Sequence, residues 1–394
     1  MAVKEIKKGI YNVGAEHWDR RLFDELIPLP YGTSYNSYVV FGRDKTAIVD
    51  TVDPSKEDVF LRNLKKLGVD ELDYIISNHA EQDHSGVIPK LLEMFPKARV
   101  VTNAKAKSFL MDLLHIEEDR FMVISEGDEL QLGGKTLKFY MTPWVHWPET
   151  MSTLLVEDGI LFSCDFFGAH IASSETFSKD DDIIYESAKR YYAEIMMPFR
   201  TAIKRNIEKI KKLDLKMIAP SHGLVYPNPD FIISAYEEWI SDDVKNKAVI
   251  AYVSMHGSTE EIVKRLYDDL VEGGIEVDFF NLTQTDIGEY AMSLVDAATL
   301  IGASPTVLGG LHPAAAFAAL LTGELRPKLK LVVIVGSYGW GGMMVDQAKT
   351  LLKGLNAEFF EPVLIKGLPK HEDYSVLDDM ANRIIEKHKE MGLM

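Results

Sequence analysis

The residues whose types and spacing most clearly suit chemistry lie in one short segment, from His79 to His84. The segment reads His-Ala-Glu-Gln-Asp-His and places four metal-ligating side chains within six residues. It follows residues 73–78, a run typical of a β-strand. Side chains in the loop after a strand can converge on a small volume without distorting regular backbone. We interpret this segment as part of a metal site.

Three further candidates each follow another strand-like run, and they are His146, Asp165 and His222. The full set offers four imidazoles and three carboxylates, enough for two metal ions with three protein ligands each and one bridging carboxylate. Asp165 is the predicted bridge, because a short carboxylate at a strand end can give one oxygen to each ion. Taken singly, each of the three could equally be a helix cap or a hydrogen-bonded core residue.

The cluster is similar to the His-x-His-x-Asp-His signature of metallo-β-lactamase-like hydrolases, except that Glu81 replaces the second histidine. A carboxylate in place of an imidazole favours iron over zinc. Open positions on iron favour redox chemistry with a diatomic ligand rather than hydrolysis. Because mixed sites also bind zinc or manganese, a di-zinc hydrolase with a flavodoxin-like regulatory module stays as the alternative.

A second set of candidate binding residues begins the carboxyl-terminal half. The strand-like run 248–253 leads into a loop followed by a helix-like segment, and the loop is Ser254, Met255, His256, Gly257, Ser258 and Thr259. Hydroxyl and N–H groups at a helix amino end bind phosphate. The loop has one glycine rather than Gly-x-Gly-x-x-Gly and lacks Gly-Lys-Ser/Thr, so a mononucleotide is favoured over a dinucleotide or a triphosphate.

Two later loops are predicted at the same edge of the sheet as the phosphate loop. One contains Ser304, Pro305 and Thr306, and the other contains Ser337, Tyr338, Gly339, Trp340 and Gly341. Glycines allow backbone to approach a flat ring closely, and aromatic side chains can stack on it. Each loop alone could be an ordinary glycine turn. Three such loops at one sheet edge predict a site for a ring-bearing mononucleotide.

Two different sheets must position these two sites. In the first half, β-branched runs alternate with helical patterns, and Asp158-Gly159 predicts a two-residue hairpin between strands, hence an antiparallel or mixed sheet. The pattern lapses into a polar stretch at 241–246, where we place a domain boundary that divides the chain into residues 1–245 and 246–394.

The second half is predicted to be an α/β domain with a doubly wound parallel five-stranded sheet. This prediction rests on five apolar runs separated by helix-length segments, at 248–253, 277–282, 298–302, 331–335 and 362–365.

Composition excludes several classes of function. The net charge of −17 would repel nucleic acid and an anionic membrane face. No apolar run reaches the roughly 18 residues of a bilayer span, and the amino end lacks the apolar core of a signal peptide, so we expect a cytoplasmic protein. The single cysteine, Cys164, excludes intrachain disulfides and iron–sulfur clusters. Any metal must therefore use histidine and carboxylate ligands.

Both halves together resemble flavodiiron proteins, over nearly the whole chain. The resemblance implies a metallo-β-lactamase-like αββα sandwich that holds two non-haem iron ions, followed by a flavodoxin-like domain that binds FMN. It assigns one iron to His79, Glu81 and His146, the other to Asp83, His84 and His222, and the bridge to Asp165. His84 has the least support, since in some members the matching histidine turns away.

The resemblance also maps the FMN phosphate onto residues 254–259 and the flavin ring onto the two later loops. It places Trp147 and Tyr192 near the metal pocket, although simple core aromatics would fit equally well. It implies reduction of dioxygen to water, of nitric oxide to nitrous oxide, or both. A flavodoxin-like electron carrier with an inactive metal site is disfavoured because the ligand set is complete.

Partners follow from the same resemblance. The electron donor is expected to be a separate molecule such as rubredoxin or a reduced deazaflavin. The assembly is expected to be a head-to-tail homodimer, with a dimer of dimers as a larger form, in which FMN of one chain serves the metal site of the other. The short linker near 242–246 favours this arrangement. It restricts how far the sheet edge with the metal site can fold onto the sheet edge with the FMN site within one chain.

Overall fold

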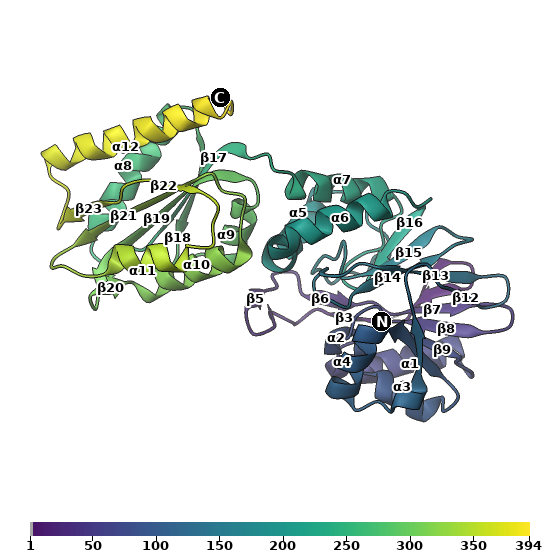
Figure 1. Cartoon of the computed structure of the whole chain (residues 1–394). Helices are drawn as coiled ribbons and strands as arrows, with labels where there is room; N and C mark the ends of the chain where they lie inside the picture. The colour runs from purple at the N-terminus through teal and green to yellow at the C-terminus, as the bar shows by residue number, and fades with distance from the viewer. Residues whose placement is uncertain (1–2) are drawn as a thin grey trace. The chain divides into compact units, whose positions relative to one another are not determined.

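The computed structural model describes residues 3–394, and these form two compact units (Figure 1). The first unit extends to Tyr192 and includes Phe199–Ile240, and the second comprises Ala193–Pro198 and Ser241–Met394. Within residues 3–394, no helix is both long enough and apolar enough to cross a bilayer.

The first unit is built on two sheets. One has the order β1-β2-β7-β8-β9-β10-β11 and the other β12-β13-β14-β15-β16. The strands of the first sheet are β1 (Lys4–Lys7), β2 (Ile10–Asn12), β7 (Tyr38–Phe41), β8 (Thr46–Val49), β9 (Tyr74–Ile76), β10 (Arg99–Asn103) and β11 (Phe121–Ile124). Those of the second are β12 (Glu129–Gln131), β13 (Thr136–Met141), β14 (Met151–Leu155), β15 (Ile160–Cys164) and β16 (Met217–Pro220). Short hairpin-like pairs add β3 (Ala15–His17) with β6 (Thr33–Tyr35), and β4 (Leu22–Phe23) with β5 (Ile27–Pro28).

The two sheets pack face to face through buried apolar side chains. Val40, Ile76 and Val101 from the first sheet join Phe139 and Phe162 from the second in one cluster. Helices cover the outer faces (Figure 1), with α1 (Glu57–Leu67), α2 (Gln82–Ser85), α3 (Ile88–Met94) and α4 (Ala104–Leu114) beside the first sheet, and α5 (Asp182–Tyr191), α6 (Arg200–Ile210) and α7 (Pro229–Ile240) beside the second. This layering confirms the predicted αββα, metallo-β-lactamase-like fold.

Strands β14 and β15 form the predicted hairpin, but with a different connection. Their last pair is Leu155 with Ile160, which leaves the four residues 156–159 between the strands rather than two. Gly159 has a φ of 64°, a conformation that glycine adopts without steric cost. The hairpin places Asp165 directly after the end of β15.

The second unit contains a sheet in the order β18-β17-β19-β21-β22. Its parallel strands are β17 (Lys245–Tyr252), β18 (Glu276–Asn281), β19 (Ala297–Val307), β21 (Leu331–Tyr338), β22 (Glu358–Phe359) and β23 (Val363–Lys366), with the antiparallel β20 (Gly310–Leu311) paired to β19. Since β22 and β23 pair with successive parts of β21, they act as one interrupted fifth strand. The predicted five-stranded, doubly wound sheet is thus confirmed.

Five helices cover the two faces of this sheet (Figure 1). Residues of α8 (Ser258–Glu272) and α12 (His371–Glu390) pack in one buried cluster with the sheet, and residues of α9 (Ile287–Leu294) and α10 (Pro313–Leu325) pack in another. The fifth helix is α11 (Met344–Leu351), whose residues Met344 and Ala348 pack against Ile334. The central strands β17, β19 and β21 are buried along most of their length, as a sheet covered on both faces requires.

One histidine of the second unit differs from its predicted place. His388 lies outside both groups of candidate site residues in the sequence, so we expect it at the surface. The same holds for His17, His115 and His371. The structure buries His388 completely, with Thr299 Oγ1 2.8 Å from Nε2 and Asn246 Oδ1 2.7 Å from Nδ1. Burial lowers the pKa of His388 to about 4. The prediction failed because α12 packs against the sheet from Leu377 through His388.

Candidate metal centre and cofactor site

Strand ends in the first unit bring seven predicted ligands into two adjoining groups. His79 and Glu81 follow β9, Asp83 and His84 lie on the short helix α2, and His146, Asp165 and His222 follow β13, β15 and β16. Ligand atoms of His79, Glu81, His146 and Asp165 all lie within 4.8 Å of one another, and so do those of Asp83, His84 and His222. These are the groupings that the sequence comparison assigned to two ions.

The first group is held around Glu81. Its Oε2 atom lies 3.0 Å from Nε2 of His79 and 3.1 Å from Nε2 of His146. Asp165 Oδ2 completes the group, 3.5 Å from Nε2 of His79 and 3.6 Å from Nε2 of His146. Four ligand atoms therefore converge from three separate loops.

The second group shares Asp165 through its other oxygen. Asp165 Oδ1 lies 3.0 Å from Nε2 of His84 and 3.4 Å from Nε2 of His222. Asp83 faces the same two rings, with Oδ1 3.2 Å from His84 and Oδ2 3.2 Å from His222. His84, the least supported ligand in the sequence, thus points into the group. Asp165 presents one oxygen to each group, as a bridging carboxylate must.

The donor set fits two metal ions. Within residues 3–394, both carboxylate oxygens of Asp83 and of Asp165 are buried without a hydrogen-bond donor. Such groups are costly to bury unless a cation compensates them. Two ligand atoms on one ion, each bonded at about 2.1 Å, lie roughly 3.0–3.4 Å apart in octahedral or tetrahedral geometry. The separations between carboxylate oxygens and imidazole nitrogens in the two groups, 3.0–3.6 Å, lie within about 0.2 Å of that range.

Outer hydrogen bonds orient two of the histidine rings. His79 Nδ1 lies 2.6 Å from Glu149 Oε1, and His222 Nδ1 lies 2.7 Å from the main-chain oxygen of Ser34. An acceptor at Nδ1 holds the proton there and leaves the Nε2 lone pair for a metal. His84 differs, because its buried Nδ1 has no partner within the described chain. Its ring therefore lacks the fixed tautomer that the other two have.

Glu149 is a residue that the sequence reasoning missed. Burial would raise the pKa of its carboxyl group, but the hydrogen bond from His79 outweighs burial, so the pKa is lowered and the carboxylate stays ionised. Asn103 Nδ2 donates to the main-chain oxygen of Glu149 at 2.6 Å and so fixes the loop that carries it. The position of Glu149, three residues after His146, is the one signal that could have identified it.

Asp50 joins the loops that carry ligands from the two sheets. Its carboxylate accepts hydrogen bonds from the main-chain and side-chain nitrogens of Asn78, at 2.8 and 3.0 Å, and from Ser221 Oγ at 3.3 Å. Asn78 and Ser221 directly precede His79 and His222. One buried carboxylate directly after β8 thus joins both ligand loops.

Aromatic rings surround the ligands, and only one of the two predicted rings lies among them. The Trp147 ring centroid is 5.0 Å from that of His79. Tyr192 instead packs against Tyr236 and Trp239. Its neighbour Tyr191 lies 5.9 Å from His222, because one residue along a helix turns the side chain by about 100°.

His170 is a further buried residue that the sequence did not indicate. Its ring centroid lies 4.9 Å from that of His222, and its Nδ1 is 2.9 Å from Thr33 Oγ1. Burial and the nearby imidazole of His222 lower the pKa of His170 well below its ordinary value, so the ring is neutral. The fold buries it because residues 166–172 pack under α5 beside the second ligand group.

We predict that Glu149→Ala lowers the metal affinity of the first group by roughly 10–100-fold, the usual effect of losing an outer-shell partner. The reason is that His79 then lacks the acceptor that holds its proton on Nδ1. Titration of the chelator-stripped protein with iron under anaerobic conditions measures the change. Glu157→Ala is the matched control, since Glu157 accepts hydrogen bonds from Thr136 and contacts no ligand. Equal affinity in both variants would contradict the assigned role.

The phosphate and ring loops of the second unit line one cavity of about 240 Å³. Ten predicted residues line it, namely Ser254, Met255, His256, Ser258, Thr259, Pro305, Thr306, Ser337, Tyr338 and Gly339, and Gly367 adds one that was not predicted. Thr259 Oγ1 and Ser337 Oγ are 2.9 Å apart and join the first loop to the third. The loops meet at the carboxyl ends of β17, β19 and β21, where doubly wound sheets bind ligands.

Four predicted residues lie outside the lining of this cavity. Gly257 directly precedes helix α8 as its N-cap and has a φ of 90°, which favours glycine. Ser304 forms hydrogen bonds within its own hairpin, from its Oγ to Pro305 O and from His312 N to its Oγ. Trp340 and Gly341 are exposed. Ser304, Pro305 and Thr306 also belong to β19 itself rather than to a loop after it.

Both halves match known protein families. Residues 33–223 match the family described as ODP family beta lactamase, and residues 250–376 match the flavodoxin family. Nitric oxide reductase of Moorella thermoacetica is 36% identical over 389 residues, which cover 96% of this chain and 97% of the relative. Coenzyme F420H(2) oxidase of Methanothermobacter marburgensis is 33% identical and covers 89% of this chain and 90% of its own.

Two solved structures resemble the whole chain. Rubredoxin oxygen:oxidoreductase from Desulfovibrio gigas superposes with a TM-score of 0.94 at 30% identity, covering 98% of both chains. The flavodiiron protein from Giardia intestinalis superposes with a TM-score of 0.90 at 26% identity, again covering 98% of both. The structural similarity therefore covers nearly the whole chain and includes both units.

Proposed function

The chain belongs to the flavodiiron family, and from this premise we propose that it reduces dioxygen to water, nitric oxide to nitrous oxide, or both. Two iron ions are proposed for the metal centre and one FMN for the second unit. The coarser conclusion, an oxidoreductase of this family, rests on full-length relatives at 30% identity or more.

The observation that carries the proposal is the position of Asp165. Its two carboxylate oxygens face different ligand groups, at 3.0 Å from His84 and at 3.5 Å from His79. A site for one ion does not need a carboxylate that faces two ligand groups, whereas two ions bridged by a carboxylate require one. Glu81 adds a third carboxylate to the set and favours iron over zinc.

The protein residues hold and orient the metal ligands. When bound, two iron ions supply open coordination positions and electrons to a diatomic gas, and FMN resupplies those electrons. Glu149 and the Ser34 carbonyl keep His79 and His222 in the tautomer that ligates through Nε2. Trp147 and Tyr191 pack beside these rings and limit water around the ligands.

The cavity of the second unit suits the phosphate and ring of FMN. Helix α8 points its amino end at the cavity, and Ser258 and Thr259 offer hydroxyl groups beside its first N–H groups. The helix dipole contributes roughly 0.3–1 kcal/mol to binding of a phosphate. Tyr338 and Gly339 provide the ring side of the same cavity.

The electron donor is proposed to be a separate molecule. The names of two relatives, rubredoxin oxygen:oxidoreductase and coenzyme F420H(2) oxidase, point to rubredoxin and to a reduced deazaflavin. Measurements with each donor at matched concentration distinguish them. With the true donor, the rate of flavin reduction is at least as high as the steady-state rate of gas consumption.

We also propose the head-to-tail homodimer as the working assembly, with a dimer of dimers as a larger form. Three large apolar side chains in the segments that follow the cavity residues Thr306 and Gly339 are exposed in the single chain, Leu308 at 95%, Trp340 at 68% and Met343 at 62%. A hydrogen bond of 2.7 Å from Met343 N to Gly309 O joins the two segments. Clustered exposed apolar residues of this size mark interaction surfaces. A partner chain that covers them would also exclude water from the flavin edge.

Anaerobic reduction followed by separate addition of dioxygen or nitric oxide tests the proposed function. We expect consumption of at least one gas by protein that contains two iron ions and one FMN per chain. Zinc without iron in protein expressed with iron available would favour the di-zinc hydrolase instead. Bound FAD, or no consumption of either gas by iron-loaded protein, would also contradict the proposal.

Glu81→His is predicted to shift the metal preference of the first group toward zinc, because an imidazole then replaces an oxygen ligand. Dialysis against equal concentrations of the two metals, followed by metal analysis, measures the shift. Glu93→His is the control, since Glu93 is an exposed residue of α3 that pairs with Lys90. An unchanged ratio of iron to zinc would contradict the claim that the Glu81 carboxylate makes the first group prefer iron.

A further inference from the structure

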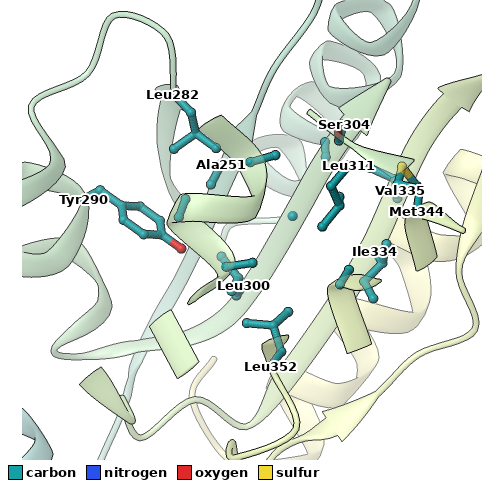
Figure 2. Close-up of a pocket in the computed structure, with 16 residues that line it drawn as sticks. Ala251, Leu282, Tyr290, Leu300, Ser304, Leu311, Ile334, Val335, Met344 and Leu352 are labelled. Carbon is teal, nitrogen blue, oxygen red and sulfur yellow. The ribbon is translucent and has the colours of Figure 1, made fainter. Parts of the chain in front are cut away.

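A second cavity lies inside the flavodoxin-like unit, apart from the proposed FMN cavity. It has a volume of about 40 Å³ and lies between the sheet and the helices α9, α10 and α11. Figure 2 shows the side chains around it, which present carbon almost everywhere. The larger side chains of the lining are those of Leu282, Leu300, Leu311, Ile334, Met344 and Leu352.

Small residues account for the space. Six alanines and Gly302 line the cavity where β17, β19, α10 and α11 would otherwise place larger side chains. Gly302 lies within β19, the central strand of the sheet, yet it keeps exposed surface. A Cβ atom built on Gly302 would meet no atom within 4 Å. Open space beside a central strand is unusual, because protein cores pack about as densely as organic crystals.

The polar atoms of the lining already have partners. Tyr290 Oη lies 2.6 Å from Thr322 Oγ1, which donates to Ala318 O at 2.7 Å. Ser304 Oγ donates to Pro305 O and accepts from His312 N. These bonds use the hydroxyl hydrogens of Tyr290 and Ser304, so the described lining offers a water molecule at most their remaining acceptor lone pairs, whereas buried water usually forms two to four hydrogen bonds. An occupant that forms no hydrogen bonds suits the cavity better.

We propose that this cavity binds small apolar molecules of the diatomic-gas class, such as dioxygen and nitric oxide. Its volume exceeds the roughly 10–15 Å³ that holds one water and falls far below the roughly 300 Å³ of a drug-sized ligand site. Dry cavities lined by aliphatic side chains bind xenon and similar apolar guests. The proposal concerns binding in the second unit and does not depend on the proposed reaction.

The cavity lies directly beside the loops proposed to hold FMN. Ser304 lines it, whereas the next residue, Pro305, lines the FMN cavity. On the neighbouring strand, Val335 lines it and Ser337 lines the FMN cavity. Leu282, Leu311 and Ala319 are only half-buried, so the lining reaches the protein surface at these residues. A bound gas would thus contact residues that are close neighbours in sequence of those proposed to hold the flavin.

Crystals of the FMN-loaded full chain under xenon pressure test the proposal. Xenon is the probe because its anomalous scattering locates it directly. We expect a xenon peak enclosed by Leu300, Ile334 and Leu352. In Ala318→Leu, the added carbons fill the cavity and the peak is expected to disappear. Ala316→Leu is the matched control, because it makes the same change on α10 at a residue outside the lining.

Absence of a peak in the parent protein would overturn the proposal, and so would a peak that persists in Ala318→Leu. Should Ala318→Leu fail to fold, Gly302→Ala provides a second test. It adds one methyl group in open space at ordinary backbone angles and is expected to reduce xenon occupancy without lowering the thermal midpoint. Unchanged occupancy in that variant would contradict the site. Dioxygen-induced relaxation of the Leu300 and Leu352 methyl resonances extends the test to a diatomic gas.

Discussion

Asp165→Ala should abolish reduction of either gas while leaving the flavin absorption spectrum intact. Among the seven candidate ligands, Asp165 is the one whose oxygens face both ligand groups, at 3.5 Å from His79 and 3.0 Å from His84. Its loss leaves each ion with one ligand fewer and removes the link between them. We expect turnover to fall by more than roughly 100-fold, beyond the effect of losing an outer-shell residue.

The spectrum should persist because the proposed FMN residues all belong to the second unit. Stopped-flow mixing of reduced protein with dissolved gas measures turnover, and metal analysis reports occupancy. Asp158→Ala is the control, since Asp158 lies in the turn of the same hairpin and pairs with Lys7 and Lys135 rather than with a ligand. Turnover near the parent rate in Asp165→Ala would show that the bridge is assigned wrongly.

The second large effect is expected from mixing two inactive variants. His79→Ala removes a ligand of the first group, and the double variant Ser258→Ala with Thr259→Val removes hydroxyl groups that line the proposed FMN cavity. If FMN of one chain serves the metal site of the other, each mixed dimer contains one intact pair of sites. Activity should then recover from near zero to a substantial fraction of the parent value.

Transfer within one chain predicts no recovery, because every chain in the mixture carries one defective site. Subunit exchange must be verified first, by mass spectrometry of differently tagged chains. A mixture of His79→Ala with His222→Ala is the control, since both variants lack a metal ligand and no pairing restores a complete site. Verified exchange without recovery would show that the arrangement in trans is wrong.

The sequence was sufficient to predict the seven candidate ligands that the fold brings together in two groups. Each ligand follows a strand-like run, and the spacing His-x-Glu-x-Asp-His is specific enough to be read without a structure. The alternation of β-branched runs and helices likewise predicts both sheets, because hydrophobic periodicity reports which elements form a core. Boundaries were less accurate, as in β19, which extends to Val307 and includes residues expected in a loop.

Only the tertiary structure identified the groups that orient the ligands. Ser34 contacts His222 through a main-chain oxygen, across 188 positions of sequence, and a main-chain atom leaves no signal in residue type. Asp50 and Glu149 act through partners that are remote in sequence, Ser221 and His79. Tyr191 rather than Tyr192 lies beside a ligand, because the rotation of the helix about its axis decides which of two neighbouring side chains faces the site.

The amino-acid sequence by itself determined which chemical groups are available and which strand ends carry them, since residue type and periodicity are local properties of the chain. The tertiary structure decided how those groups face one another, which oxygen of Asp165 serves which group, and where packing leaves a cavity beside Gly302. These features depend on contacts between segments far apart in the chain. Such contacts are set by the packing of whole layers, which no local pattern records.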